Sequence, residues 1–339
     1  TQVIQTDLDT WAESKTQILA RIKGLSATSG WLTLSSSHRP TYPTLPSDSD
    51  GTYLLAYDLE SGSYLGAGAV PGQPQNQFSF DVWTPPNGKK HLRVATTKTV
   101  GRRVSMSTHI TTLAPDGQGL LKVLGQTADL APTETMQSMR FMEDKGYLVT
   151  YRFIDPLFAL DLSDPSNPRV TGELKVPGFS TYLHPIAGNR LIGIGSNGNW
   201  GYANRTKVSL FDVSDPLQPL ESYTQELDPF EYTNATWDHH AFIWSSGHNL
   251  LAVPTTIWPN SQIRLLSVTG SATTGTLSFA SLNATVNVGG NSYLLPAQLK
   301  RVFFLGNQII GVSDRGMLGS SIFDPATPQL RVEWKTDWE

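Results

Sequence analysis

The segment from Trp237 to Phe242, "WDHHAF", holds the residues of this sequence that are best suited to metal chemistry. Imidazole binds zinc and copper readily, but a protein site normally supplies at least three ligands. On a strand, neighbouring side chains point to opposite faces, so Asp238 and His240, but not His239, are expected to share an ion. The third ligand must come from elsewhere in the chain, such as His184. The sequence thus offers one possible metal site and indicates no other cofactor.

Motifs of the common catalytic classes are absent from the sequence. It has no G-x-S-x-G elbow, H-E-x-x-H pair, P-loop or EF-hand loop. The glycines of "GIGSNGNWG" (193–201) lie between two predicted strands, which does not fit a dinucleotide site. A non-catalytic protein is therefore favoured. The alternative is an extracellular hydrolase or lyase, for which the candidate catalytic residues are Arg140, His184, Asp238 and His240.

Paired aspartates recur along the chain in a fixed setting. "ALDLSDPSNP" (159–168) is repeated as "LFDVSDPLQP" (210–219) and, in shorter form, as "IFDPATP" (322–328). Carboxylates at this spacing fit either a catalytic pair or a turn. Asp and Ser bond to backbone N–H groups two residues on, and a following proline presets the φ of a type I turn. We interpret Asp161, Asp212 and Asp324 as turn residues.

The same aspartates mark a repeat. Equivalent positions follow one another at intervals of 48 to 57 residues: Asp58, Leu113, Asp161, Asp212, Ser267 and Asp324. One unit (137–176) reads as four strands, "QSMRFME", "GYLVTYRF", "PLFALDLS" and "RVTGELKV". A period of about 40 to 50 residues with four strands per unit is typical of a β-propeller blade. The sequence predicts an all-β propeller with about five full blades and a partial one.

The N-terminal residues are expected to form a separate segment, 1–51, before a propeller at 52–339. Leu8, Trp11, Leu19 and Ile22 share one helical face, with Gly24 as the helix end. Residues 35–51 are expected to form a loop. The first blade then lacks its inner strands, because "YLLAYDLE" and "YLGAGAV" supply only the outer two, although "GWLTLSSS" (30–37) could replace one.

Several strings resemble a known family. They include "FIDPLFALDLSDPSNPRVTGELKVPGFSTYLHP" (153–185), "MRFMEDKGYLVTYRFIDPLF" (139–158), "KVSLFDVSDP" (207–216), "DHHAF" (238–242) and "VSDRG" (312–316). Together they resemble the secreted β-propeller family of bacteria and archaea, which is distantly related to WD repeats and largely uncharacterised in function. The resemblance implies secretion and further blades before the N-terminal helix. This sequence departs from the family at His240, where a lysine is usual.

The repeat phase also aligns a set of polar residues on successive inner strands. They are Asp81, Arg140, His184, His240 and Arg301. Propellers bind ligands near the central channel, so this set predicts a channel-lining ring. The alternative is that these side chains bond neighbouring blades, because buried polar groups need partners whatever the function.

Composition limits the partners and the compartment. Lys and Arg number 25 and Asp and Glu 29, so the net charge of −4 argues against nucleic acid. Cysteine is absent, which excludes disulfides, and no apolar run reaches the length of a transmembrane segment. The sequence begins without Met or a signal peptide, which we interpret as processing or truncation. N-x-S/T sequons at Asn204, Asn234 and Asn283 favour an extracellular or cell-surface glycoprotein.

These observations predict a secreted binding or assembly module. An incomplete blade exposes unpaired backbone groups, which another chain or a cleaved N-terminal part can complete by strand addition. The expected partner is therefore a protein or a second copy of the chain, as in a filament subunit. A polysaccharide is the other possible ligand.

Overall fold

A computed structural model describes most of the chain. The described residues are 2–6, 13–17, 21–38, 51–86, 88–100, 105–151, 155–199, 204–257, 260–269, 276–284, 298–314, 316–321 and 334–337. The chain divides into two compact units. Unit 1 comprises residues 1–152 with 158–171, and unit 2 comprises 153–157 with 172–339.

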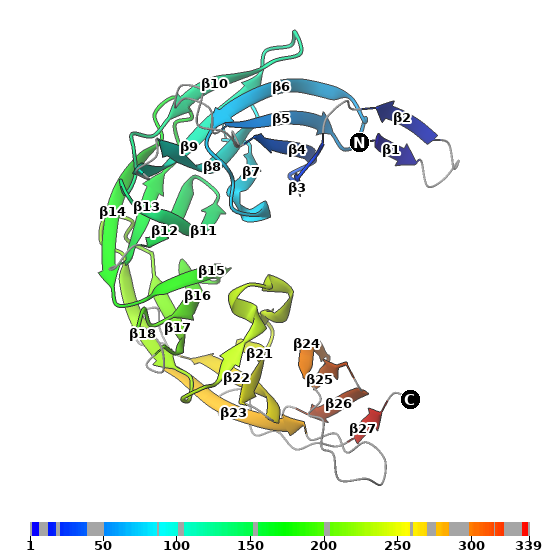
Figure 1. Cartoon of the computed structure of the whole chain (residues 1–339), viewed down its shortest axis with the longest axis vertical. Helices are drawn as coiled ribbons and strands as arrows, with labels where there is room; N and C mark the ends of the chain where they lie inside the picture. The colour runs from blue at the N-terminus through cyan, green and yellow to red at the C-terminus, as the bar shows by residue number, and fades with distance from the viewer. Residues whose placement is uncertain are drawn as a thin grey trace. The chain divides into compact units, whose positions relative to one another are not determined.

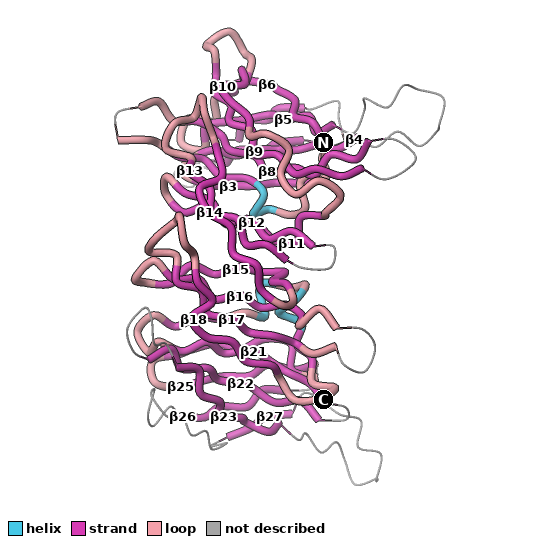
Figure 2. Tube along the Cα trace, turned by 90° about the vertical axis from the view of Figure 1, so that its left-hand side faces the viewer, coloured by secondary structure: helices cyan, strands magenta, loops and turns pink. Residues whose placement is uncertain are grey.

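The fold consists of antiparallel sheets, as the repeat predicts, and strands make up most of the described chain (Figure 2). Unit 1 contains two complete four-stranded sheets. The first is formed by β3 (Gly24–Thr28), β4 (Trp31–His38), β5 (Gly51–Asp58) and β6 (Tyr64–Pro71). The second is formed by β7 (Phe80–Trp83), β8 (His91–Val100), β9 (Ser105–Pro115) and β10 (Leu121–Gln126).

The third sheet contains the blade that the sequence displays in full. Its strands follow chain order: β11 (Thr135–Met142), β12 (Lys145–Tyr151), β13 (Asp155–Asp161) and β14 (Arg169–Val176). In Figure 1 each sheet is drawn as consecutive strands lying side by side, as expected for blades built from successive segments.

Unit 2 contains three further sheets. The fourth is β15 (Phe179–Ile186), β16 (Arg190–Ser196), β17 (Thr206–Asp212) and β18 (Leu220–Glu226). The fifth has β19 (Tyr232–Thr233), β20 (Ile243–Ser245), β21 (Leu250–Ile257), β22 (Asn260–Thr269) and β23 (Thr276–Ala284), with β19 and β20 both paired to β21. The sixth is β24 (Leu299–Leu305), β25 (Gln308–Ser313), β26 (Gly316–Ser321) and β27 (Trp334–Asp337).

Central strands are buried on both faces. All seven residues of β17 are buried, as are the five inner residues of β16. Their apolar side chains, such as Ile192 and Leu210, pack with Leu251 of the fifth sheet in one core cluster. This two-sided burial explains the nearly continuous apolar runs of these strands. Among the described residues, no helix has the length and apolar character needed to cross a membrane.

The predicted N-terminal helix is wrong. Residues Glu13–Gln17 form β2, which pairs with β1 (Gln2–Thr6), and residues 7–12 and 18–20 lie outside the described part. The cross-strand backbone pairing prevails over a helical pattern that rested on four apolar residues. Gly24 begins β3 instead of ending a helix, and a β-carbon there would lie 2.5 Å from Oγ of Ser35 on β4.

The predicted gap in the first blade is also wrong. β3 pairs with β4, and β4 pairs with β5 from Trp31 opposite Asp58 to His38 opposite Gly51. The first sheet therefore has all four strands, and it begins at Gly24, inside the segment 1–51 that was expected to stand apart. The suggestion that 30–37 could supply one inner strand is correct, since these residues contain most of β4, whereas β3 was not predicted. Residues 39–50, which lie outside the described part, separate β4 from its partner β5 in the sequence.

The aspartate repeats form turns, as predicted. Oδ1 of Asp161 accepts hydrogen bonds from the backbone N and Oγ of Ser163 at 3.0 and 2.6 Å. Asp212 binds Ser214 in the same way, at 3.0 and 2.7 Å. Burial raises the pKa of Asp161, but the bonds from Ser163 and the charge of Arg169 outweigh it and lower the pKa below its usual value. The third copy, at Asp324, lies outside the described residues.

Each turn also docks on the outer strand of the preceding sheet at a glycine. In unit 1, a β-carbon at Gly125 of β10 would lie 2.6 Å from the carbonyl oxygen of Pro165. In unit 2, a β-carbon at Gly172 of β14 would meet the carbonyl oxygen of Pro216. Only glycine allows the two backbones to approach this closely.

We expect Gly125→Ala and Gly172→Ala each to lower the free energy of unfolding by about 1–3 kcal/mol, because the added methyl group overpacks a backbone contact. Gly247→Ala is the matched control, since a β-carbon at Gly247 would meet no atom within 4 Å. Its stability should stay within about 0.5 kcal/mol of the wild type. Chemical denaturation of the three variants checks this. Equal stability of all three would contradict the docking.

Candidate functional site

The predicted channel-lining residues fall into both units. Asp81, Arg140, His184 and Arg301 lie on β7, β11, β15 and β24, each the first or last strand in the pairing order of its sheet, as expected. His240 does not lie on a strand, because it belongs to the short 3-10 helix η4 (His239–Ala241). The structure brings Asp81 near Arg140 in unit 1 and Arg301 near His240 in unit 2. A ring that joins the two units stays a prediction.

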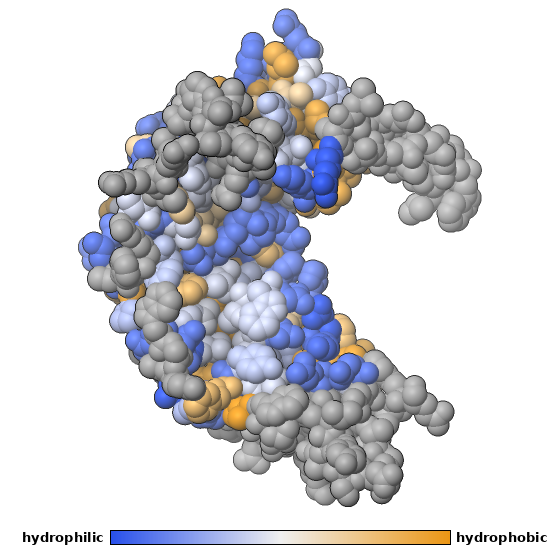
Figure 3. Space-filling model, in the orientation of Figure 1, coloured by the Kyte–Doolittle hydropathy of each residue, from blue (hydrophilic) through white to orange (hydrophobic). Residues whose placement is uncertain are grey.

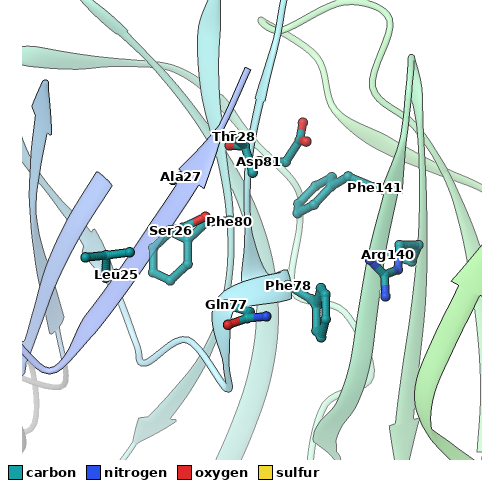
Figure 4. Close-up of a pocket in the computed structure, with 10 residues that line it drawn as sticks. All are labelled: Leu25, Ser26, Ala27, Thr28, Gln77, Phe78, Phe80, Asp81, Arg140 and Phe141. Atoms are coloured by element: carbon teal, nitrogen blue, oxygen red, sulfur yellow. The ribbon is translucent and has the colours of Figure 1, made fainter. Parts of the chain in front are cut away.

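In unit 1, Asp81 and Arg140 line a pocket of about 360 Å³ between β3, β7, β11 and the 3-10 helix η1 (Gln77–Ser79). Figure 4 shows Phe78 of η1 beside Arg140 of β11. The guanidinium carbon lies 4.1 Å from the centre of the Phe78 ring, a cation–π contact. A capping box holds η1 in place, with Oδ1 of Asn76 accepting from the Phe78 backbone N at 2.9 Å.

The charge of Asp81 is already matched by a buried arginine, Arg93 on β8. Nε and Nη2 of Arg93 both donate to Oδ2 of Asp81, and Nη1 donates to the backbone oxygen of Glu143. Its guanidinium also lies 5.3 Å from the Trp83 ring centre and 4.9 Å from that of Phe141. Burial lowers the pKa of Arg93, and Asp81 partly opposes this. Asp81 thus anchors an arginine between two aromatic rings.

Sequence analysis missed Arg93, although a signal was present. It is a lone charge between Leu92 and Val94, both fully buried in the same strand. A buried guanidinium requires a carboxylate partner, so a charge inside an apolar strand predicts one on a neighbouring strand.

We expect Asp81→Asn to lower the free energy of unfolding by about 2 kcal/mol, because it leaves the Arg93 charge buried without its partner. The double variant Asp81→Asn with Arg93→Met should recover part of this loss, since an apolar side chain needs no counterion. Asp129→Asn is the control, because its carboxylate is 66% exposed and lies 3.3 Å from His109 Nε2. Thermal unfolding compares them. A double variant less stable than Asp81→Asn would contradict this account.

In unit 2, the segment "WDHHAF" forms a helical turn instead of a strand. Oδ1 of Asp238 caps η4 by accepting from the His240 backbone N at 3.1 Å, and it also bonds to His240 Nδ1 at 3.2 Å. The helical turn brings the rings of His239 and His240 within 4.0 Å, centre to centre. The expectation that these two histidines point apart is therefore wrong, because it assumed a strand.

The geometry changes the candidate metal ligands. One ligand atom each from Asp238, His239 and His240 lie within 4.8 Å of one another, which suits zinc or copper. Among the described residues, this potential ligand set includes His239 in place of the predicted His184. His184 instead contacts Phe242 and bonds to the hydroxyl of Tyr182 at 3.2 Å.

Arg301 disfavours the binding of a metal ion by Asp238, His239 and His240. Its Nη2 lies 2.8 Å from Oδ2 of Asp238, the carboxylate that a metal would require. Burial raises the pKa of Asp238, but hydrogen bonds from His240 and the charge of Arg301 outweigh this and lower it. The cluster is a capped turn held by an ion pair, and a metal must compete with Arg301 for the carboxylate.

The three sequons lie in different settings. Asn204 is exposed, and its Oδ1 accepts from Oγ of Ser196 at 2.6 Å. Asn234 begins the 3-10 helix η3 (Asn234–Thr236) and is half-buried. Asn283 lies within β23, paired with Gln262. Asn204 is therefore more accessible to a glycan than Asn234.

A second buried ion pair, which sequence analysis also missed, fixes the segment before β19. The side chain of Glu231 is fully buried, and its two oxygens accept from Nε and Nη2 of Arg264 at 2.8 and 2.7 Å. Thr255 and Gln262 also donate to Glu231 Oε1. Burial raises the pKa of Glu231, but these donors and the arginine charge outweigh it and lower the pKa.

Because the pKa of Glu231 is lowered in the folded state, its ion pair with Arg264 stabilises the fold at pH values above the pKa of the glutamate in the unfolded chain. This stabilisation is lost as the pH falls through the folded-state pKa. We expect Glu231→Gln to cost about 3 kcal/mol at neutral pH, because Arg264 loses its main partner. The difference between wild type and variant should shrink only below the ordinary glutamate value of 4.5. Denaturation curves across acidic pH measure it. A difference independent of pH would contradict the ion pair.

Relatives of this chain are found among archaeal proteins. An uncharacterized protein of Methanocaldococcus jannaschii is 41% identical over 189 residues, covering 56% of this chain and 28% of that protein. An uncharacterized protein of Archaeoglobus fulgidus is 38% identical over 204 residues, covering 60% of this chain and 29% of that protein. The chain therefore spans less than a third of the length of these relatives.

Similar solved structures include two proteins of low identity. The β-propeller domain of the Trilobed protease from Pyrococcus furiosus, which has an open velcro topology, gives a TM-score of 0.43 at 8% identity, covering 89% of this chain and 83% of that one. An oligogalacturonate lyase in complex with manganese gives 0.43 at 11% identity, covering 81% and 71%. Neither similarity bears on the activity of this chain.

The match to a protein family is more extensive. The family described as the beta propeller domain matches residues 1–323 of the 339, which includes all of the first five sheets. The protein therefore belongs to the beta propeller domain family.

Proposed function

We propose that the chain is a non-catalytic β-propeller module that binds another molecule outside the cell. The observation that carries this proposal is the pairing of two predicted site carboxylates with guanidinium groups, those of the channel-lining Asp81 and of the candidate catalytic residue Asp238. Asp81 is held by Arg93, and Asp238 by Arg301. A general base must be free to take a proton near the operating pH, whereas the lowered pKa of Asp238 disfavours proton uptake.

The extracellular part of the proposal rests on composition. The sequence has no cysteine and contains three N-x-S/T sequons. Strand addition to an incomplete first blade is not part of the proposal, because the first sheet has four strands. A binding role fits instead with pockets on the surface of each unit. Because the chain spans less than a third of its curated relatives, the partners of a longer protein belong to the same proposal.

A second candidate function is supported by the Asp238–His240 cluster. Three ligand atoms within 4.8 Å of one another would allow a metal-dependent hydrolase or lyase acting on polysaccharide or peptide. Zinc would there polarise a carbonyl oxygen or activate water. The ion pair to Arg301 weighs against it, since the guanidinium already neutralises the carboxylate.

Calorimetric titration of chelator-treated protein with zinc and copper separates the two functions. For the binding module, we expect wild-type protein to bind either ion more weakly than Arg301→Ala, because that substitution frees the Asp238 carboxylate. The variant His239→Ala with His240→Ala should bind neither. Tight stoichiometric binding by the wild type would contradict the proposal. So would metal-dependent cleavage of a polysaccharide or peptide that is lost in the triple alanine variant of Arg140, His184 and His240.

A further inference from the structure

A pocket in unit 2, which the sequence analysis did not single out, is lined by three exposed aromatic side chains. It lies between residues of β15, β16 and β17 and the segment 230–237, with a volume of about 440 Å³. Trp237 is 68% exposed, Phe230 67% and Tyr232 39%. Small-molecule sites have volumes of roughly 300–1,000 Å³. Figure 3 shows pale residues, which are of intermediate hydropathy, on the surface of unit 2. They lie where Figure 1 draws the segment between β18 and β21.

The backbone of Phe230 is strained. In the turn Asp228–Glu231, the Glu231 backbone N donates to the Asp228 oxygen at 3.0 Å, and φ of Phe230 is +64°. Proline at the second position and positive φ at the third are the marks of a type II turn, where glycine is the normal third residue. A phenylalanine there destabilises the turn through the strain of its backbone, although most of its side chain is exposed. Strain of this kind is a sign of a functional position.

Hydrogen bonds to neighbouring strands fix the segment 230–237, which carries the three aromatic side chains. Glu231 ties the turn to Arg264 of β22 through two hydrogen bonds. Oγ1 of Thr181 donates to the backbone oxygen of Thr236 at 2.5 Å, and Oγ1 of Thr233 donates to that of Pro254 at 2.6 Å. The exposed rings therefore sit on a rigid base, which lowers the entropy lost when a ligand binds.

The facing wall of the pocket is polar. Asn204 and Arg205 line it, together with Ser196. Because Oγ of Ser196 donates to Oδ1 of Asn204 at 2.6 Å, the NH₂ end of that amide is oriented as a donor. The pocket thus combines apolar ring faces with hydrogen-bonding groups.

Charge in the pocket is already balanced. Arg205 Nε lies 3.5 Å from Glu226, and Glu231 is paired with Arg264. An ionic ligand would gain no uncompensated partner here, so the pocket favours an uncharged one. A sugar ring presents C–H groups on its faces and hydroxyls on its edge, which match aromatic faces on one side and amide and hydroxyl groups on the other.

We infer that this pocket binds a neutral saccharide, stacked on Trp237 and Phe230 and hydrogen-bonded by Asn204. The inference rests on the binding role proposed above and names the ligand for it. A proline-rich peptide also stacks on aromatic residues, but it docks in an extended groove and carries few hydroxyl groups for the polar wall.

Titration with soluble neutral oligosaccharides (cellohexaose, maltohexaose, xylohexaose and chitohexaose) tests the inference by calorimetry. The protein is made without glycosylation, because a glycan on Asn204 would occupy the same space. We expect at least one of the four to bind, and Trp237→Ala to weaken binding on the order of tenfold or more. Phe230→Gly should weaken it similarly while leaving the melting temperature unchanged or raised, because glycine adopts the positive φ without strain.

Tyr53→Ala is the control, since this side chain is 64% exposed on β5, in the other unit. Its binding should equal that of the wild type. Absence of binding at millimolar concentrations, or binding unaffected by Trp237→Ala and Phe230→Gly, overturns the inference. Binding of a proline-rich peptide with the same loss in both variants also overturns it but leaves the binding role intact. Cleavage of a bound oligosaccharide overturns the non-catalytic role instead.

Discussion

The docking of an aspartate-proline turn on a glycine of the preceding sheet is the contact on which the rest of the fold depends. It brings the Pro165 oxygen against Gly125 in unit 1 and the Pro216 oxygen against Gly172 in unit 2. Thr112 adds a hydrogen bond from its hydroxyl to the Pro165 oxygen. The turn must therefore hold the carbonyl oxygen of its proline in a fixed position against the glycine of the neighbouring strand. Asp and Ser hold the turn in shape from within, which explains why the same string recurs at the blade period.

Buried arginine–carboxylate pairs supply a second kind of link, between strands and loops. Arg93 and Arg264 each stand between two fully buried apolar residues of a strand, and each pairs with a carboxylate from another part of the chain. Such pairs add little net stability relative to apolar side chains, because desolvation offsets the attraction between the charges. Their effect is on position. Asp81 fixes the Arg93 guanidinium between the Trp83 and Phe141 rings, and Arg264 holds the strained turn that carries Phe230.

The sequence predicted what depends on local repetition and missed what depends on distant pairing. The blade strands and the Asp161 and Asp212 turns recur at similar intervals along the sequence, so each copy supports the prediction of the others. β3 and β4 have no such support, because β4 pairs with β5 across residues 39–50. The error at His239 had a local cause. The alternation of side chains holds only on a strand, and Asp238 caps a helical turn there. Arg93 and Arg264 left a readable signal, a charge within an apolar strand, but their partners lie 12 and 33 residues away.

Stability and recognition depend on different residues of the turns and loops. The carboxylates of Asp161, Asp212 and Asp238 accept hydrogen bonds within their own turns, and that of Glu231 binds Arg264 on β22. In the segment 228–237 the situation is reversed, because the aromatic rings are exposed and Phe230 adopts a backbone conformation that costs about 1–2 kcal/mol for a non-glycine residue. The segment tolerates this cost because the next residue, Glu231, has a fully buried side chain that pairs with Arg264. The buried pair of Glu231 and Arg264 thus fixes the strained backbone that carries the exposed ring of Phe230.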